Sequence, residues 1–166
     1  MTNRIAVYPG TFDPVTNGHI DLIRRALEIF PQVVVGVAEN PGKGTLFSVE
    51  DRVAMLQEAT HRWPGVRVKP FGGLSVSFAR AQGSRVILRG LRMLTDFEYE
   101  FQLALTNRRL DPKVETVFLM PSAETSYLSS RLIKEAAGLG AKVQGLVPSF
   151  VAKRLREKLN DEGQTE

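Results

Sequence analysis

The stretch IAVYPGTFDPVTNGHIDLI, residues 5–23, contains a strand, a specialised loop and the start of a helix in direct succession. Residues 5–8 form a short, continuous apolar run, which predicts a strand. Ile20, Ile23, Leu27 and Phe30 then follow at helical spacing, which predicts a helix over residues 19–30. The loop between these elements contains two glycines and ends on His19, one of only 2 histidines in the chain.

Strands and helices alternate about five times along the rest of the chain. The β-branched run VVVGVA, residues 33–38, shows no alternation of apolar and polar residues, as expected for a strand buried on both faces. This pattern predicts an α/β fold, a parallel sheet with helices on both faces. Ser48 is a plausible helix cap, and Thr95 followed by Glu98 predicts a capping box. The other predicted strands span residues 66–71, 85–88 and 115–121, and the other predicted helices span residues 48–60, 75–83, 95–109, 130–138 and 149–159.

Length and composition indicate a single globular domain. The 166 residues are 43% hydrophobic and 24% charged, so we expect one domain over residues 1–160 and a polar tail over residues 161–166. The chain contains no cysteine, which excludes disulfides and thiolate metal sites and is compatible with a reducing compartment. The first residues do not form a signal peptide, and no apolar stretch approaches the roughly 18 residues of a membrane span. We therefore expect a cytoplasmic protein.

The net charge is +4 and the sequence pI is about 9.6. A basic balance of this kind favours anionic partners, which include nucleic acids, phosphorylated metabolites and acidic membranes. Composition alone does not distinguish among these partners.

The loops that follow the predicted strands are rich in glycines, hydroxyl groups and cations. In an open parallel sheet, ligands bind beyond the carboxyl ends of the strands, so these loops should meet at one edge. They read PGTFDPVTNGH, ENPGKGTLFS, GGLS, RGLRMLTD and PSAETSYLSSR in chain order. This arrangement predicts an anion-binding site at that edge.

The first loop is the strongest candidate for chemistry. Gly10 and Gly18 allow the backbone to approach a ligand closely, and the start of the next helix favours an anion. His19 lies in the first turn of that helix, where an imidazole could neutralise charge that develops on a phosphate, and Thr11 offers a hydroxyl group at the same place. The alternative is that Gly10 and Asp13-Pro14 only form turns and that His19 is an exposed helix residue. The combination of loop position, glycines and helix start favours function.

The remaining loops offer further cations and helix starts. Lys43 stands in a glycine loop that does not have P-loop spacing, and it is either a mobile phosphate ligand or a solvated lysine. Arg89 and Arg92 follow a buried strand, and each needs an anionic partner, which is a phosphate or a nearby carboxylate. Ser129 and Ser130 at a helix start are either caps or phosphate ligands. Donors and cations without a clear nucleophile or base suit phosphoryl or nucleotidyl transfer.

Several strings of the sequence resemble a known family. TNGH, residues 16–19, resembles the T/H-x-G-H signature of the nucleotidyltransferase superfamily, and YLSSRLIKE, residues 127–135, resembles its second signature. YPGTFDPVTNGHIDLI (8–23), ILRGLR (87–92), DFEYEFQLALTNR (96–108) and SSRLIKE (129–135) are similar to the bacterial phosphopantetheine adenylyltransferases. The similarity extends from about residue 4 to residue 159, in the same order.

The resemblance implies a doubly wound, Rossmann-like fold and a defined reaction. In this family ATP and 4′-phosphopantetheine give dephospho-coenzyme A and pyrophosphate, with Mg²⁺ as cofactor and no covalent enzyme intermediate. The resemblance also implies a homohexamer, and coenzyme A is a candidate feedback ligand. We expect Mg²⁺ to be bound mainly through ATP, with no metal site on the protein, and we expect neither nucleic acid nor membrane as a partner.

Site residues follow from the resemblance position by position. His19 is expected to stabilise the transition state at the α-phosphate. The acceptor 4′-phosphopantetheine is expected to contact Thr11, Lys43, Ser75 and Arg89. ATP is expected to contact Thr11, Phe12, His19, Gly90, Leu91, Arg92, Glu100, Thr125, Ser126, Tyr127, Leu128, Ser129, Ser130 and Arg131. Thr125 and Arg131 depart from the family pattern, in which an aromatic residue and a serine are common.

Two other functions are open at this point. A nucleotidyltransferase of the same fold could act on nicotinate mononucleotide or glycerol phosphate, although such enzymes are not expected to combine RGLR with DFEYE. A nucleic-acid-binding module is suggested by the pI and by the basic residues of the last helix. That helix also contains acidic residues and lacks interleaved aromatic residues for base stacking, so we consider this function the weaker of the two.

Overall fold

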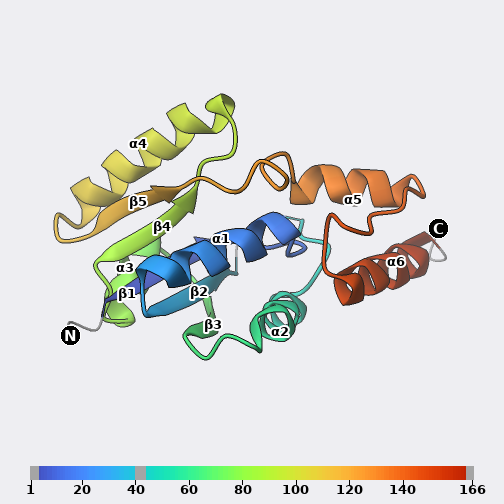
Figure 1. Ribbon diagram of the computed structural model, residues 1–166, viewed down its shortest axis with the longest axis horizontal. Helices are drawn as coiled ribbons and strands as arrows, with labels where there is room; N and C mark the ends of the chain where they lie inside the picture. Colours follow the sequence, from blue (N-terminus) through green and yellow to red (C-terminus); the bar gives the residue numbers. More distant parts are fainter. Residues whose placement is uncertain (1–3, 40–43, 164–166) are drawn as a thin grey trace.

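The computed structural model describes residues 4–39 and 44–163 and confirms the predicted α/β fold (Figure 1). All strand pairs of the five-stranded sheet are parallel, and the strand order is β3-β2-β1-β4-β5. The chain thus builds one side of the sheet outward from β1 and then returns to build the other side, which is the doubly wound topology. The elements are β1 (Ile5–Gly10), α1 (Asn17–Ile29), β2 (Gln32–Ala38), α2 (Val49–Thr60), β3 (Val66–Phe71), α3 (Ser75–Ala81), β4 (Val86–Gly90), α4 (Leu94–Leu110), β5 (Glu115–Leu119), α5 (Ser130–Gly138) and α6 (Ser149–Gly163).

Successive side chains of the central strands enter two separate cores, one on each face of the sheet. Val33 and Val35 of β2 belong to the larger core with α1, α2 and α6, whereas Val34 belongs to the smaller core with α3. The smaller core is tightly packed, because a Cβ atom on Gly36 would lie 2.4 Å from the ring of Phe78 in α3. Burial on both faces explains why β2 reads as an uninterrupted apolar run.

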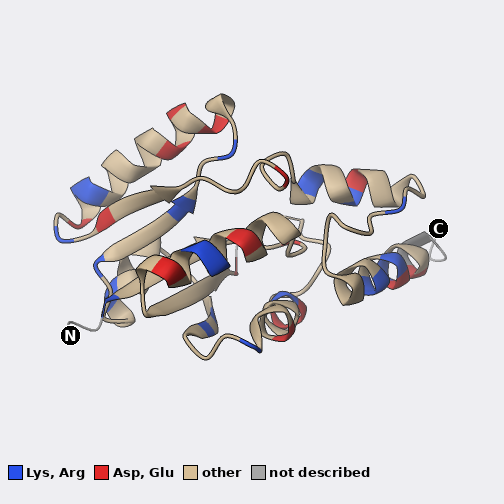
Figure 2. Ribbon diagram, viewed as in Figure 1, with Lys and Arg blue, Asp and Glu red and all other residues tan. Residues whose placement is uncertain are grey.

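The last two helices extend beyond the end of the sheet (Figure 1). The segment before α6 is held at the start of α1, because the backbone N–H of Asn17 donates to the carbonyl of Leu146 and its side chain donates to the carbonyl of Gly145, at 3.0 and 2.7 Å. α6 continues to Gly163 and therefore includes the first residues of the expected polar tail. Both signs of charge are interspersed along α6 (Figure 2).

The predicted helix caps are partly correct. Ser48 caps α2 by accepting from the backbone N–H of Asp51 at 3.1 Å. The predicted capping box at Thr95 is wrong, because α4 begins at Leu94 with Met93 as its N-cap residue and has no side-chain cap bond. Thr95 already lies within the first turn of the helix, where its hydroxyl group cannot serve as the cap.

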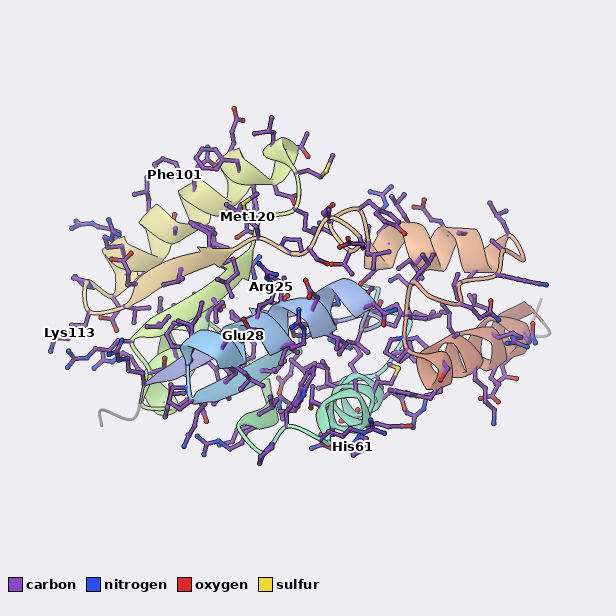
Figure 3. All side chains as sticks on the ribbon, viewed as in Figure 1. Arg25, Glu28, His61, Phe101, Lys113 and Met120 are labelled. Atoms are coloured by element: carbon purple, nitrogen blue, oxygen red, sulfur yellow. The ribbon has the colours of Figure 1, made fainter. Side chains whose placement is uncertain are left out.

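α4 is unusual because its apolar side chains face solvent. The two side chains that it buries, Glu100 and Asn107, are polar. Phe97 and Phe101 stack on each other with ring centroids 5.8 Å apart, and each is about half exposed, at 49% and 48%. Figure 3 shows Phe101 on the side of α4 that points away from the sheet. No helix in the described part of the chain is long and apolar enough to cross a membrane.

Candidate active site

A cavity of about 640 Å³ opens at the carboxyl ends of β1 and β4. These two strands are neighbours in space but not in sequence, so the cavity lies where the winding direction of the sheet reverses. Its walls come from the loop after β1, the start of α1, the loop after β4, α4, and the loop that leads into α5. The position agrees with the edge predicted from the sequence.

Most of the predicted site residues line this cavity together. They are Thr11, Phe12, His19, Arg89, Gly90, Arg92, Glu100, Thr125, Leu128, Ser129, Ser130 and Arg131. Ser75, Leu91, Ser126 and Tyr127 are not among the residues that line it. Lys43 lies outside the described residues.

His19 is held by the N-cap of its own helix. The backbone N–H of Thr16 donates to Nδ1 of His19 at 3.0 Å, and the backbone N–H of His19 donates to Oγ1 of Thr16 at 3.3 Å. Because Nδ1 accepts a hydrogen bond from an amide, the proton of the neutral imidazole must be on Nε2. Nε2 is therefore a hydrogen-bond donor.

The ring of Phe12 fixes the imidazole from the side. Phe12 meets His19 edge-on with ring centroids 4.9 Å apart, and it meets Tyr8 in the same manner at 5.3 Å. The backbone of Phe12 has a φ of 53°, which is uncommon for a bulky residue and occurs where surrounding contacts hold the chain. Gly10 makes this arrangement feasible, because a Cβ atom there would lie 2.9 Å from the Phe12 ring.

The surroundings keep His19 neutral. Burial, followed by the positive charges of Arg92 and Arg89, lowers the pKa of His19 from 6.5 to about 4. At neutral pH the imidazole is thus an uncharged donor at Nε2 between two arginines. The sequence did not fix the protonation state of this imidazole, and the lowered pKa indicates the neutral form.

Arg89 and Glu100 form a two-point ion pair across the cavity wall. Nε and Nη2 of Arg89 donate to the two carboxylate oxygens of Glu100 at 2.8 and 2.6 Å, and Nη1 donates to the carbonyl of Pro9 at 3.0 Å. Burial by itself would lower the pKa of Arg89, but the hydrogen bonds and charge of Glu100 raise it. The carboxylate partner considered from the sequence is therefore present, and the contact with a phosphate stays a prediction. The planar guanidinium group is thereby held in one orientation at the end of β4.

Arg92 joins the loop after β4 to the loop before α5. Its Nη1 donates to the carbonyl of Leu128 at 2.8 Å, and its Nε donates to Asp96 at 3.3 Å. The side chain is 40% exposed, so it can reach a ligand in the cavity.

The loop before α5 is anchored on α1. Asp21 accepts from the backbone N–H of Ser122 at 2.8 Å and from the hydroxyl group of Thr125 at 3.4 Å. The carbonyl of Thr125 lies close to Gly18, where an added Cβ atom would be 3.2 Å away. Gly18 therefore allows this loop to approach the start of α1.

The two serines at the start of α5 form hydrogen bonds there, whereas Arg131 is exposed. Ser129 is the N-cap residue, and the hydroxyl group of Ser130 donates to the carbonyl of Pro14 at 2.8 Å. The prediction that Ser129 serves as a helix cap is thus confirmed. The side chain of Arg131 is 85% exposed and pairs with Glu135 on the same helix.

Among the residues of the cavity wall that were not predicted as site residues, Asp13, Lys134 and Tyr8 have the most informative contacts. Asp13 and Lys134 form an ion pair, and Tyr8 lies beside Arg89, with its pKa raised to about 12 by burial. Asp13 lies in GTFDP and Lys134 in SSRLIKE, so both belong to strings that marked the site. Asp13 was interpreted only as a turn former, and no local pattern indicated that a lysine 121 residues away is its partner.

The carboxylates of the cavity do not form a metal site. Asp13, Asp96 and Glu100 pair with Lys134, Arg92 and Arg89 respectively. Within residues 4–39 and 44–163, no group of three or more His, Asp or Glu side chains could hold a metal ion. The cavity is thus built to receive anionic groups through donors and cations.

Similarity to known proteins first defines the class of this protein. Residues 7–136 match the family model described as cytidylyltransferase-like, and the chain belongs to that family. A putative nicotinate-nucleotide adenylyltransferase from Vibrio parahaemolyticus has the same fold, with a TM-score of 0.67, 15% identity and coverage of 98% of this chain and 94% of that one. A lipopolysaccharide core biosynthesis protein from Thermoplasma volcanium also matches, with a TM-score of 0.51, 20% identity and coverage of 72% and 96%.

Sequence identity then defines the particular family. The chain is 51% identical over 160 residues to the phosphopantetheine adenylyltransferase of Carboxydothermus hydrogenoformans, covering 96% of this chain and 99% of that protein. It is 54% identical over 155 residues to the phosphopantetheine adenylyltransferase of Moorella thermoacetica, covering 93% and 97%. The chain belongs to the phosphopantetheine adenylyltransferase family, which confirms the resemblance found in its sequence.

Proposed function

We propose that this enzyme transfers the adenylyl group of ATP to 4′-phosphopantetheine, giving dephospho-coenzyme A and pyrophosphate. The observation that carries the proposal is the neutral His19, whose Nε2–H donor stands beside Arg89 and Arg92 in a cavity that also receives the first turns of α1 and α5. Relatives at about 50% identity over nearly the whole chain have the name of this activity.

The reaction is a direct displacement at phosphorus. A phosphate oxygen of the acceptor attacks the α-phosphorus of ATP, the new P–O bond forms as the bond to the bridging oxygen breaks, and pyrophosphate leaves. Nε2–H of His19 donates to an oxygen of the α-phosphate and stabilises the charge that accumulates there. A neutral donor suits this role because it binds the reacting phosphate without a full positive charge that would also tighten the ground state.

The nucleotide occupies the side of the cavity between α1 and α5. Arg92 and the amide groups at the start of α5 contact the phosphates, and Gly90 contacts the nucleotide from the wall after β4, where a Cβ atom would lie 2.5 Å from Leu22. The loop from Thr125 to Ser130 forms the opposite wall, and the contact of Arg92 with the carbonyl of Leu128 keeps this wall beside the loop after β4.

The acceptor phosphate occupies the side of the cavity near β1 and β4. Thr11 and Arg89 lie on this side, and Glu100 presents the guanidinium group of Arg89 with Nη1 and Nη2 still able to donate further hydrogen bonds. Lys43 supplies a second cation for the same phosphate. Ser75, at the start of α3, contacts the pantetheine arm outside the cavity itself.

Mg²⁺ enters with the nucleotide. The three cavity carboxylates are each paired with a cation, so residues 4–39 and 44–163 offer no ready ligand set, and the phosphates of ATP and water would supply the ligands of Mg²⁺.

The enzyme acts in the cytoplasm as a homohexamer, with coenzyme A as a feedback ligand of the same cavity. The exposed apolar face of α4 supports self-association, because contiguous apolar surface of this kind marks protein interfaces. Coenzyme A carries the pantetheine and nucleotide groups of the product, so it fits a cavity that accepts both substrates.

The test is pyrophosphate release from ATP and Mg²⁺ with 4′-phosphopantetheine, nicotinate mononucleotide or glycerol phosphate as acceptor. We expect release only with 4′-phosphopantetheine, together with dephospho-coenzyme A in the product mixture. Release only with another acceptor would overturn the substrate assignment but not the displacement chemistry. Absence of turnover with every acceptor, combined with salt-sensitive binding to duplex DNA, would instead favour a nucleic-acid-binding protein.

A further inference from the structure

The carboxylate of Asp13 joins three segments that are far apart in the sequence. Oδ2 and Oδ1 of Asp13 accept from the backbone N–H groups of Leu46 and Phe47 at 3.0 and 2.9 Å. Oδ2 also accepts from Nζ of Lys134 in α5. Asp13 itself belongs to the loop that ends on His19, and only 5% of its surface is exposed. One carboxylate therefore holds the loop after β1, the segment before α2 and the second turn of α5.

The loop after β1 is attached to α5 at two successive turns. The hydroxyl group of Ser130 donates to the carbonyl of Pro14, and Lys134, four residues later on the same helix face, donates to the neighbouring residue Asp13. Ser130 and Lys134 both line the cavity. These contacts fix the distance between the start of α5 and the loop that presents Thr11, Phe12 and His19.

A buried arginine reinforces the same junction. Arg52 is 1% exposed and donates to the carbonyls of Thr11 and Ala38 through Nη1 and to those of Phe47 and Ser48 through Nε. Burial lowers the pKa of Arg52, and the negative charge of Asp13 opposes that change. Asp13 thus stands between two cations, Arg52 and Lys134. Its charge cannot be removed without leaving both cations and two backbone donors poorly compensated.

We propose that Asp13 and Lys134 are a pair of positioning residues that hold the α5 wall of the cavity in register with the loop of His19. In this role Lys134 acts through Asp13. The inference rests on the proposed function in one respect, because the kinetic part of its test measures the proposed reaction. A displacement of about 1 Å between the reacting groups costs on the order of 10²-fold in rate, so the pair should affect turnover far more than substrate binding.

The experiment is a double-mutant cycle with Lys134→Met, Asp13→Asn and the double variant, measured as kcat and KM for both substrates. We expect each single change to lower kcat by roughly 30- to 100-fold with KM values within about 5-fold of wild type. We expect the double variant to fall within about 3-fold of the worse single variant, because both changes break the same contact. Lys134→Arg should recover most of kcat, since it keeps a cation that can reach Asp13.

Hydrogen exchange supplies a readout that does not depend on activity. The amides of Leu46 and Phe47 are protected by Asp13, so both Lys134→Met and Asp13→Asn should raise their exchange rates by about 10-fold or more. Lys153→Met is the matched control, because Lys153 is an exposed lysine in an i,i+4 pair with Glu157 on α6. This control should change neither kcat nor the two exchange rates. If Asp13→Asn does not fold, Lys134→Met carries the test alone.

Three results would overturn the proposal. The first is a double variant whose loss of kcat equals the product of the losses in the two single variants. Another is a rise in KM for ATP with unchanged kcat in Lys134→Met, which would make Lys134 a phosphate ligand. The third is a loss of kcat without any change in exchange at Leu46 and Phe47. A wild-type protein that is inactive with every acceptor would contradict the proposed function, whereas the exchange measurement would still decide on the positioning pair.

Discussion

The backbone amide of Thr16 donates to Nδ1 of His19 at 3.0 Å, and this contact leaves Nε2 as the nitrogen that carries the proton. The donor is therefore set by the helix cap and does not depend on a carboxylate partner for the imidazole. Phe12 meets the ring edge-on at 4.9 Å and limits its rotation. Two contacts from the same loop thus aim one N–H group, in the manner of a preorganised oxyanion site.

His19→Ala should lower kcat by about 10²- to 10³-fold, because it removes a donor to charge that develops in the transition state. The Kd for ATP should change little, since Arg92 and the two helix starts remain. His19→Gln places an amide N–H near the position of Nε2 and should recover part of kcat. Steady-state kinetics and calorimetric titration with ATP measure the two effects. A large loss of ATP affinity with normal turnover would contradict the role of His19 in the transition state.

The pKa of His19 also predicts how stability depends on pH. This pKa is about 4 in the folded chain and 6.5 without the fold, so between these values the unfolded chain binds the extra proton. The resulting contribution to stability is present above pH 6.5 and is lost as the pH falls toward 4. Between pH 7 and pH 5 the free energy of unfolding should drop by about 1 to 2 kcal/mol more in wild type than in His19→Gln.

Chemical denaturation of wild type, His19→Gln and His61→Gln at pH 7 and pH 5 checks this linkage. His61 lies exposed just after α2, where its ring contacts the carbonyl of Glu58, so its variant is the control and should keep the wild-type difference. An equal change in the free energy of unfolding between pH 7 and pH 5 in wild type and His19→Gln would show that His19 titrates normally in the folded protein. The lowered pKa of His19 would then be ruled out.

Arg89→Lys should separate the two substrates. A lysine keeps the charge but cannot make the two parallel hydrogen bonds to Glu100, so the cation loses its fixed orientation. We expect kcat/KM for the acceptor to fall by about 10- to 100-fold while KM for ATP changes by less than about 3-fold. Glu100→Gln should produce a smaller loss of the same kind, because the amide oxygen of glutamine still accepts one hydrogen bond from the guanidinium group of Arg89. An equal loss for ATP and acceptor would contradict the assignment of Arg89 to the acceptor side.

The sequence predicted the parts of this protein that depend on local patterns. Continuous apolar runs such as residues 33–38 mark buried parallel strands, and the loops that follow them must meet at one edge of the sheet. His19, Arg89 and Arg92 were found in this way, because each lies immediately after or near a predicted strand end. The fold family and the substrate followed from the motifs in these loops.

The sequence did not predict contacts that depend on distant partners. The ion pair of Asp13 with Lys134 spans 121 residues. Nothing local distinguishes Asp13 from an ordinary turn residue before proline. The capping box failed for a related reason. Thr95 and Glu98 have the right spacing, but the N-cap residue is Met93, two residues before Thr95. For Arg131 the sequence left a phosphate contact or an outward orientation, and the side chain pairs with Glu135 while its residue lines the cavity, so the phosphate contact stays a prediction.

The apolar face of α4 predicts self-association. Phe97, Phe101 and Leu105 are each about half exposed on this helix, and a charge placed among them should oppose the burial of this face against another copy. Wild type should sediment as six copies of the 18.4 kDa chain, about 110 kDa, and Phe101→Glu should shift it toward smaller species. Leu139→Glu is the matched control, because Leu139 is 90% exposed in the loop after α5 and should leave the sedimenting mass unchanged. A wild-type protein that sediments at 18.4 kDa at micromolar concentration would refute the hexamer, and a Phe101→Glu protein of unchanged mass would exclude α4 from the interface.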